Sequence, residues 1–384
     1  MSRVGVGRPS RHLTNMVKPE AVALAGAVAV GAAAYYAARF LFSRRSAASY
    51  ANKPNNDSKL AVRRVKMSPA GPTVSELVVG LMRFTTWGAK YSPEQTLNVV
   101  KECIAMGITT FDCAAIYGGG DLKHDQEANL GAALALAPGL RETIEIVTKC
   151  GIIMRPGAAH SNYYDSSADA IVESVNKSLA ALQTSFIDVL LIHRPDLLMD
   201  ADEVAAAFTQ LRSTGKVRFF GVSNFSAAQV TLLTSRLPAD MPLVTNQLEL
   251  SLSHTKLLSY PYGDGTLDVC QQLRARPMAW SPLGPIGGPK LVGSEPKSDK
   301  EKKIRAAVRE VANELCLPDA DGDAAATAVA IGWVAKHPSQ PLIITGSTKL
   351  ERIVQAVDGL AVARRMSRLQ WYRLLEASVG YAVP

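Results

Sequence analysis

From residue 77 to residue 346 the chain alternates eight times between a short apolar run and a stretch with helical character. The apolar runs are mostly continuous, as is typical of strands that are buried on both faces in a parallel sheet. Eight strand–helix units over roughly 300 residues predict a (β/α)₈ TIM barrel. A doubly wound sheet is the alternative, but no GxGxxG run opens a helix after an early strand.

The predicted strands and helices follow one another regularly. The strands are expected at residues 77–82, 108–112, 144–149, 187–193, 216–223, 242–248, 277–281 and 341–346. The helices are expected at residues 92–106, 126–136, 166–182, 201–211, 226–237, 267–274, 302–315, 324–336 and 367–377. Ser92 and Pro93 are a typical N-cap and first helical residue.

Three successive predicted strands end in ionisable residues, namely Asp112, Lys149 and His193. Tyr117 follows Asp112 by five positions and precedes a run of glycines. Strands in a parallel barrel point the same way, and their carboxyl ends form the face where such barrels keep their active sites. These four side chains are therefore expected to converge.

Together the four residues suit proton transfer to a carbonyl oxygen. A free tyrosine has a pKa of about 10, too high for an efficient acid at neutral pH, and a neighbouring ammonium group lowers it. We therefore expect Lys149 to lower the pKa of Tyr117, Asp112 to hold Lys149 in place, and His193 to orient the carbonyl group. Each residue taken singly could instead cap a turn, lie in solvent or cover the core, and only the set of four favours a site.

The positive charge of the chain is concentrated at its N-terminus. Residues 1–71 hold 12 Lys/Arg and 2 Asp/Glu, a balance of +10, whereas the remainder holds 30 and 32, a balance of −2. A nearly neutral domain has no nucleic-acid footprint. The five cysteines are scattered without CxxC spacing, which argues against a disulfide framework or a metal site and for a reducing compartment.

Residues 1–45 form a basic segment that contains an uncharged stretch, 21–38, just long enough to cross a bilayer. We expect an N-terminal membrane anchor; a cleaved targeting peptide and a surface helix are the alternatives. Residues 46–71 are polar and read as a linker to the barrel at 72–384. An intracellular membrane such as the mitochondrial outer membrane fits these features, with the barrel facing the cytosol.

From Val74 to Pro384 the chain resembles the aldo-keto reductases, especially the bacterial oxidoreductase branch. The resemblance rests on seven segments in matching order and spacing: FDCAAIYG (111–118), VTKCG (147–151), LLIHRPD (190–196), GVSNF (221–225), TNQLE (245–249), AWSPLG (279–284) and IITGS (343–347). It implies a TIM barrel that binds NADPH and reduces the carbonyl group of a small molecule, with Tyr117 as general acid. Monomers are the expected state.

The resemblance also assigns cofactor contacts. The positions that hold the nicotinamide carboxamide are matched by Ser223, Asn224 and Gln247, and the aromatic residue that stacks on the nicotinamide ring is matched by Trp280. The pyrophosphate contacts are matched by Ser281 and Leu283. The segment at the adenosine phosphate is matched by Gly346, Ser347, Lys349, Arg352 and Gln355. Many members have lysine where Gly346 stands and Glu-Asn where Gln355-Ala356 stand. From the residues themselves, Asn224 could cap a helix and Trp280 could be core.

Two points stay open at the level of sequence. Some proteins of this family act as cofactor-sensing subunits of membrane channels, so a regulatory subunit is the alternative to an enzyme. Phe84 and Trp87, near the end of the first strand, are candidates for the substrate pocket, or they pack beneath a loop.

Overall fold

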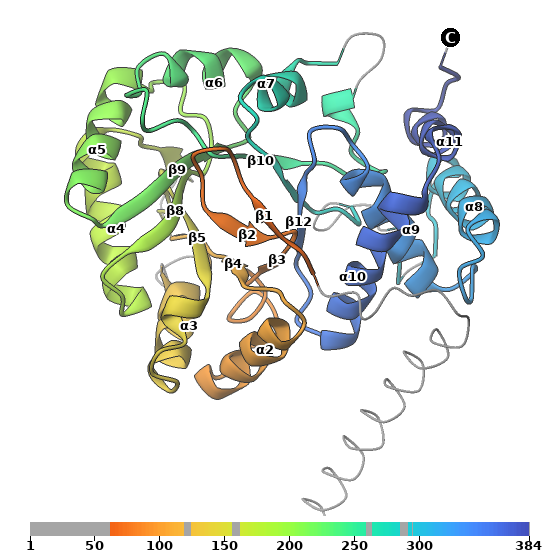
Figure 1. Cartoon of the computed structure of the whole chain (residues 1–384), viewed down its shortest axis with the longest axis horizontal. Helices are drawn as coiled ribbons and strands as arrows, with labels where there is room; N and C mark the ends of the chain where they lie inside the picture. The colour runs from red at the N-terminus through yellow and green to blue at the C-terminus, as the bar shows by residue number, and fades with distance from the viewer. Residues whose placement is uncertain are drawn as a thin grey trace, which may run out of the picture. The chain divides into compact units, whose positions relative to one another are not determined.

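The structure is a computed structural model that describes residues 62–118, 124–155, 162–258, 263–284, 291–293 and 295–383 (Figure 1). Eight parallel strands form a closed barrel. They are β3 (Leu77–Gly80), β4 (Thr110–Asp112), β5 (Glu145–Cys150), β8 (Ile187–Ile192), β9 (Val217–Ser223), β10 (Asn246–Glu249), β11 (Met278–Trp280) and β12 (Leu342–Thr345). The barrel closes where β12 pairs with β3, so the predicted (β/α)₈ fold is confirmed and the doubly wound alternative is wrong.

The strands are apolar throughout because both of their faces are buried. In β5, Ile146 packs outward with the helices, whereas Val147 joins a second apolar cluster inside the barrel. Leu190 and Leu191 divide in the same way in β8. Successive side chains of a strand point to opposite faces, so a strand between two apolar layers needs apolar residues at every position.

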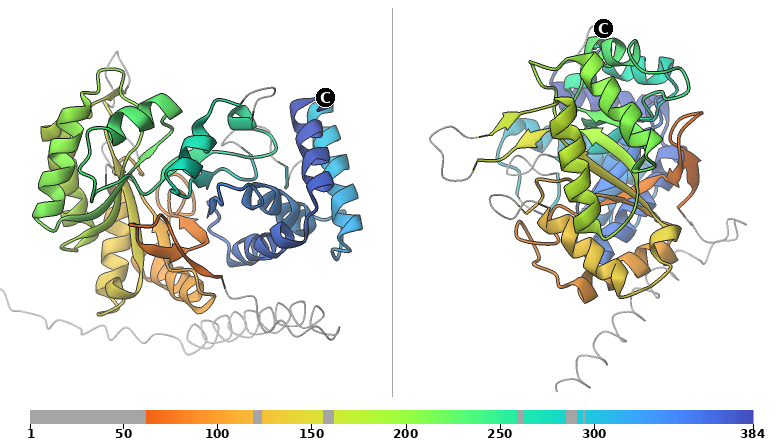
Figure 2. Two further views of the ribbon diagram at one scale, coloured as in Figure 1. Left: turned by 45° about the horizontal axis from the view of Figure 1, so that its top comes forward. Right: turned by 90° about the vertical axis from the view of Figure 1, so that its left-hand side faces the viewer.

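Helices surround the strands (Figure 1). They are α2 (Pro93–Ala105), α3 (Asp125–Ala135), α4 (Ala168–Leu182), α5 (Ala201–Ser213), α6 (Ala227–Thr234), α7 (Thr266–Gln272), α9 (Asp323–Ala335) and α10 (Leu350–Arg365). Two further helices, α8 (Asp299–Glu314) and α11 (Arg368–Val379), pack against each other (Figure 2). Ser92 caps α2 as predicted, in a capping box with Gln95.

Helix α10 was not predicted, and tertiary packing explains why. Gly359 lies in the middle of α10, where glycine costs about 1 kcal/mol relative to alanine. A Cβ atom at this position would lie only 2.4 Å from the Cβ of Ile331 on α9. The glycine therefore permits the close contact of two helices, which local propensity does not reveal.

The folded barrel begins before residue 72. Strand β1 (Arg64–Lys66) pairs antiparallel with β2 (Thr73–Ser75), and this hairpin lies in front of the strands in Figure 1. Met67 and Val74 from the hairpin are fully buried in the cluster inside the barrel. The predicted linker therefore extended too far, because its last ten residues, 62–71, belong to the folded unit.

The remaining N-terminal predictions, a segment at 1–45 and a linker at 46–61, lie outside the described residues and stay predictions. Within the described ranges, no helix has both the length and the apolar character that a bilayer span requires.

Candidate active site

A cavity of about 580 Å³ lies at the carboxyl ends of the strands. Its volume is within the range of small-molecule and cofactor sites. Lys149 and Lys349 are the two predicted site residues that do not line this cavity. The predicted site residues that do line it are Asp112, Tyr117, His193, Ser223, Asn224, Gln247, Trp280, Ser281, Leu283, Gly346, Ser347, Arg352 and Gln355. The predicted convergence of strand ends is therefore observed.

Lys149 lies fully buried beside Tyr117 and connects three oxygen atoms. Its Nζ donates to Asp112 Oδ2 at 2.8 Å, to the Cys113 carbonyl oxygen at 2.6 Å and to Tyr117 Oη at 3.0 Å. Asp112 Oδ1 accepts from Gln247 Nε2 at 2.8 Å. The three protons of the ammonium group are thus all used, and the phenol oxygen accepts one of them. The hydroxyl proton of Tyr117 is left for a partner in the cavity.

His193 lies beside the phenol. The two ring centroids are 6.1 Å apart with an edge-on angle of 80°, and the ring of Trp87 is also 6.1 Å from that of Tyr117. Burial, together with the positive charges of Lys149 and Arg194, holds the pKa of His193 well below its usual value of 6.5. The imidazole is therefore neutral at neutral pH and can donate one hydrogen bond without adding charge.

The pKa of Tyr117 differs from the sequence-based expectation. Burial raises this pKa to about 12, although Lys149 pulls it downward. Burial alone would lower the pKa of Lys149, but Asp112 and Tyr117 raise it to about 12. Lys149 lowers the pKa of Tyr117, as expected, but desolvation of the phenolate outweighs this contribution because Asp112 already compensates the ammonium charge. In the free protein the phenol is protonated, which is the form needed to donate a proton.

This electrostatic arrangement predicts a flat pH profile for any reaction in which Tyr117 donates a proton. The acid form is lost only as pH rises through a pKa of about 12. His193 gains its proton only well below pH 6.5. We expect kcat for carbonyl reduction to stay constant from about pH 7 to about pH 10, measured at constant ionic strength. A basic limb centred near about pH 8 would instead show that Lys149 lowers the pKa of Tyr117 in the working enzyme.

Asn224 and its neighbours form a second hydrogen-bonded set at the cavity. Asn224 Nδ2 donates to Ser223 Oγ at 2.8 Å, and its Oδ1 accepts from Trp280 Nε1 at 3.2 Å. Helix α6 is capped by Ser226 with Gln229, so Asn224 is not its cap. Trp280 is only partly buried and lines the cavity, so it is not plain core.

The backbone at this end of the cavity adopts an unusual conformation. Asn224 and Ser281 have φ values of 62° and 52°, in the left-handed region that non-glycine residues seldom occupy. Such residues cluster at ligand-binding and catalytic sites, where the surrounding structure holds them in place. Both line the cavity, which points to a ligand-binding role for the loops after β9 and β11.

The other end of the cavity lies at the start of α10. Ser347, Arg352 and Gln355 line it, whereas Lys349 is exposed at the N-cap and does not. The N-terminus of a helix favours anions, and a guanidinium group can bind a phosphate through two hydrogen bonds. A Cβ atom at Gly346 would meet nothing within 4 Å, so the lysine common at this position would also have room.

A model of the Aldo/keto reductase family matches residues 76–373, which is most of the chain. The chain belongs to this family. It is 45% identical over 326 residues to oxidoreductase YdhF of Escherichia coli, covering 84% of this chain and 100% of that protein. It is 40% identical to a 6-dehydroglucose reductase of Agrobacterium fabrum, in a match that covers 81% of this chain and 96% of that protein. The protein is therefore an oxidoreductase that depends on a nicotinamide cofactor.

Solved structures agree with the fold. The thermostable aldo-keto reductase Tm1743, solved with the inhibitor epalrestat, superposes with a TM-score of 0.63 at 21% identity. The match covers 82% of this chain and 99% of that one. At this identity the likeness supports the barrel architecture alone.

Sequence reasoning missed several residues of this aldo-keto reductase that line the cavity. Arg83 follows β3, Arg194 directly follows His193, and Ile152 lies in β6 (Ile152–Ile153), which pairs with β7 (Tyr163–Tyr164). Both arginines had a sequence clue, because Arg194 follows the predicted site residue His193 and Arg83 precedes the pocket candidate Phe84. Of the two predicted pocket aromatics, Trp87 lines the cavity.

The other aromatic, Phe84, is fully buried and packs edge-on against Tyr91, with ring centroids 5.4 Å apart. It does not line the large cavity, so for this residue packing beneath the loop is the correct alternative.

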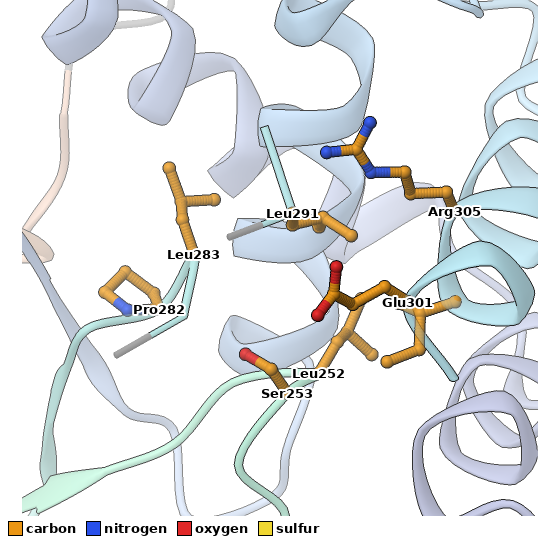
Figure 3. A pocket seen from close by; sticks show the side chains of 8 residues that line it. Leu252, Ser253, Pro282, Leu283, Leu291, Glu301 and Arg305 are labelled. Atoms are coloured by element: carbon orange, nitrogen blue, oxygen red, sulfur yellow. The ribbon is translucent and has the colours of Figure 1, made fainter. Parts of the chain in front are cut away.

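A second cavity of the reductase shares Pro282 and Leu283 with the large one (Figure 3). Its volume is about 10 Å³, and Glu301 and Arg305 extend toward it from α8. That volume holds about one water molecule, which excludes a substrate or cofactor.

Proposed function

We propose that this protein reduces an aldehyde or ketone to an alcohol, with NADPH as the hydride donor. The observation that carries the proposal is the buried Lys149 ammonium group, hydrogen-bonded to both Asp112 and Tyr117 beside a ligand-sized cavity. Such an arrangement does little to stabilise a barrel, because the attraction within a buried ion pair seldom exceeds the free energy needed to remove both charges from water. It is well suited to receiving negative charge on the phenol oxygen.

The chain's own residues would act on the carbonyl oxygen. Tyr117 donates its hydroxyl proton to this oxygen as the carbon gains a hydride. The phenolate that remains is stabilised by Lys149 Nζ, 3.0 Å from the phenol oxygen. The neutral His193 ring donates a hydrogen bond that holds the carbonyl group against Tyr117. A proton from solvent then restores the phenol, and the alcohol leaves.

The residues present fit a dinucleotide phosphate. Ser223, Asn224 and Gln247 provide hydroxyl and amide groups for the nicotinamide carboxamide, and Trp280 offers a ring to stack on. The cavity extends to the start of α10, where Arg352 and the helix N-terminus would hold the adenosine 2′-phosphate. Bound there, NADPH would supply the hydride.

The direct test is turnover by the purified full-length chain. With NADPH and 4-nitrobenzaldehyde, we expect loss of NADPH absorbance and equimolar formation of the alcohol. Tight NADPH binding without turnover of any aldehyde, ketone or quinone would contradict the proposal. That result would support a cofactor-sensing subunit instead.

The preference for NADPH over NADH depends on Arg352 in this proposal. Arg352→Ala removes a charge-assisted hydrogen bond to the 2′-phosphate, so NADPH should bind roughly 10- to 100-fold more weakly. NADH lacks this phosphate, and its affinity should change less than about twofold. Titration of intrinsic fluorescence with each cofactor measures both constants.

The control for Arg352 is Arg364→Ala, which removes a cation from the last turn of the same helix. It should leave both affinities unchanged. Equal weakening of NADH and NADPH binding by Arg352→Ala would show that Arg352 does not recognise the 2′-phosphate.

A further inference from the structure

Two arginines of the cavity lack an anionic partner. Arg83 and Arg194 line the same cavity as Tyr117 and His193, and both are partly buried. Among the residues that the structure describes, neither guanidinium group makes an ion pair or a hydrogen bond; that of Arg194 lies over the ring of Trp280, 5.6 Å from the ring centroid. This contact orients the side chain but does not neutralise its charge.

Arg141, whose side chain is only 11% exposed, is paired. Arg141 donates to Asp188 Oδ2 at 2.8 Å and to the Phe186 carbonyl oxygen at 2.9 Å. Removing a cation from water is costly unless an anion or several acceptors replace the water. The absence of such groups around Arg83 and Arg194 within the described ranges is typical of a site whose anion arrives with the ligand.

The acidic residues of the cavity do not compensate these charges. Asp112 is bound by Lys149 and by Gln247. Asp323 accepts a hydrogen bond from the Gly293 backbone at 3.1 Å. Both carboxylates therefore already have partners in the part of the chain that the structure describes.

Both arginines belong to segments that also carry residues close to the reacting groups. Arg194 directly follows His193, and its charge contributes to lowering the pKa of that histidine. Arg83 is in the same loop as Trp87, whose ring is 6.1 Å from the ring of Tyr117. The third arginine of the cavity, Arg352, belongs to α10 at the phosphate end.

We propose that the substrate is an aldehyde or ketone that carries a carboxylate group, which Arg194 binds together with Arg83. This inference rests on the proposed reductase function and names its substrate class. The planar guanidinium fork matches a carboxylate through two parallel hydrogen bonds. Binding of the carboxylate by these arginines holds the carbonyl group of the same molecule near Tyr117 and His193.

The experiment compares acids with their neutral esters. The full-length protein with NADPH is assayed on 4-carboxybenzaldehyde and its methyl ester, and on succinic semialdehyde and its methyl ester. Within at least one pair, we expect kcat/KM to be roughly 10- to 100-fold higher for the acid. In Arg194→Ala the acid should lose most of this advantage, whereas kcat/KM for the ester should change less than about twofold.

Three variants make the result specific. Arg194→Lys keeps the charge without the fork and should retain part of the preference for the acid. Arg83→Ala should reduce the preference for the acid over the ester, as Arg194→Ala does. Arg155→Ala removes an exposed cation that follows β6 outside the cavity, and the acid-to-ester ratio should not change.

Each contrary outcome has a separate meaning. Equal efficiency with acid and ester in the wild type would overturn the carboxylate proposal and leave the reductase proposal standing. If Arg194→Ala weakens NADPH binding and lowers kcat/KM equally for acid and ester, Arg194 binds the cofactor. That result would also overturn the carboxylate proposal. No turnover of these pairs or of 4-nitrobenzaldehyde would overturn both proposals.

Discussion

Tyr117→Phe is expected to lower kcat for aldehyde reduction by roughly 10²- to 10⁴-fold, the usual contribution of a positioned general acid. The substitution removes the hydroxyl group that Lys149 contacts at 3.0 Å and leaves the ring between Trp87 and His193. Without the hydroxyl proton, the carbonyl oxygen must take its proton from water. The NADPH dissociation constant should change less than about twofold, so fluorescence titration separates lost chemistry from lost binding.

The matched control for Tyr117 is Tyr372→Phe on α11, which removes a hydroxyl group from a residue that does not line the large cavity. It should leave kcat unchanged. A Tyr117→Phe enzyme with wild-type turnover would show that the proton comes from another group, and the proposed mechanism would have to be abandoned.

Lys149→Met is expected to lower the free energy of unfolding by about 3–5 kcal/mol, the usual cost of removing one partner of a buried ion pair. Lys149 is 0% exposed at its side chain and Asp112 is 3% exposed. Methionine fills a similar volume, but it leaves the Asp112 carboxylate without its counter-charge. Equilibrium denaturation with urea measures the loss, and reductase activity should fall with it because Tyr117 loses its cationic neighbour.

A second substitution tests this explanation. Adding Asp112→Asn to Lys149→Met removes the unpaired charge while an amide oxygen can still accept from Gln247, so part of the lost stability should return. Lys177→Met breaks an exposed pair with Glu173 and should barely move the urea midpoint. If the double variant is no more stable than Lys149→Met alone, the loss arises from packing rather than from charge.

The strands and their polar ends could be predicted from local patterns. A strand buried on both faces must be apolar along its length, so an aspartate or histidine that ends such a run marks a strand end. Asp112, Lys149 and His193 were found in this way, and chain direction in a parallel barrel then required them to meet. Helix caps such as Ser92 are equally local.

Contacts between distant segments were beyond that reasoning. Met67 and Val74 fill the barrel interior from a hairpin in a part of the sequence where no strand was predicted. Gly359 allows a neighbouring helix to pack closely against α10. The net direction of the Tyr117 pKa shift was also beyond that reasoning, because it depends on how completely the protein excludes water from the phenol.

The sequence by itself determined the order of the strands and helices, the barrel, and the identity of the four residues at the strand ends. These follow from periodicity and chain direction, which are properties of neighbouring residues. Only the tertiary structure decided the protonation state of Tyr117, the closeness of α9 and α10, and the unpaired state of Arg83 and Arg194 among the described residues. Burial and the pairing of charges depend on residues far apart in the chain, and only the folded molecule brings them together.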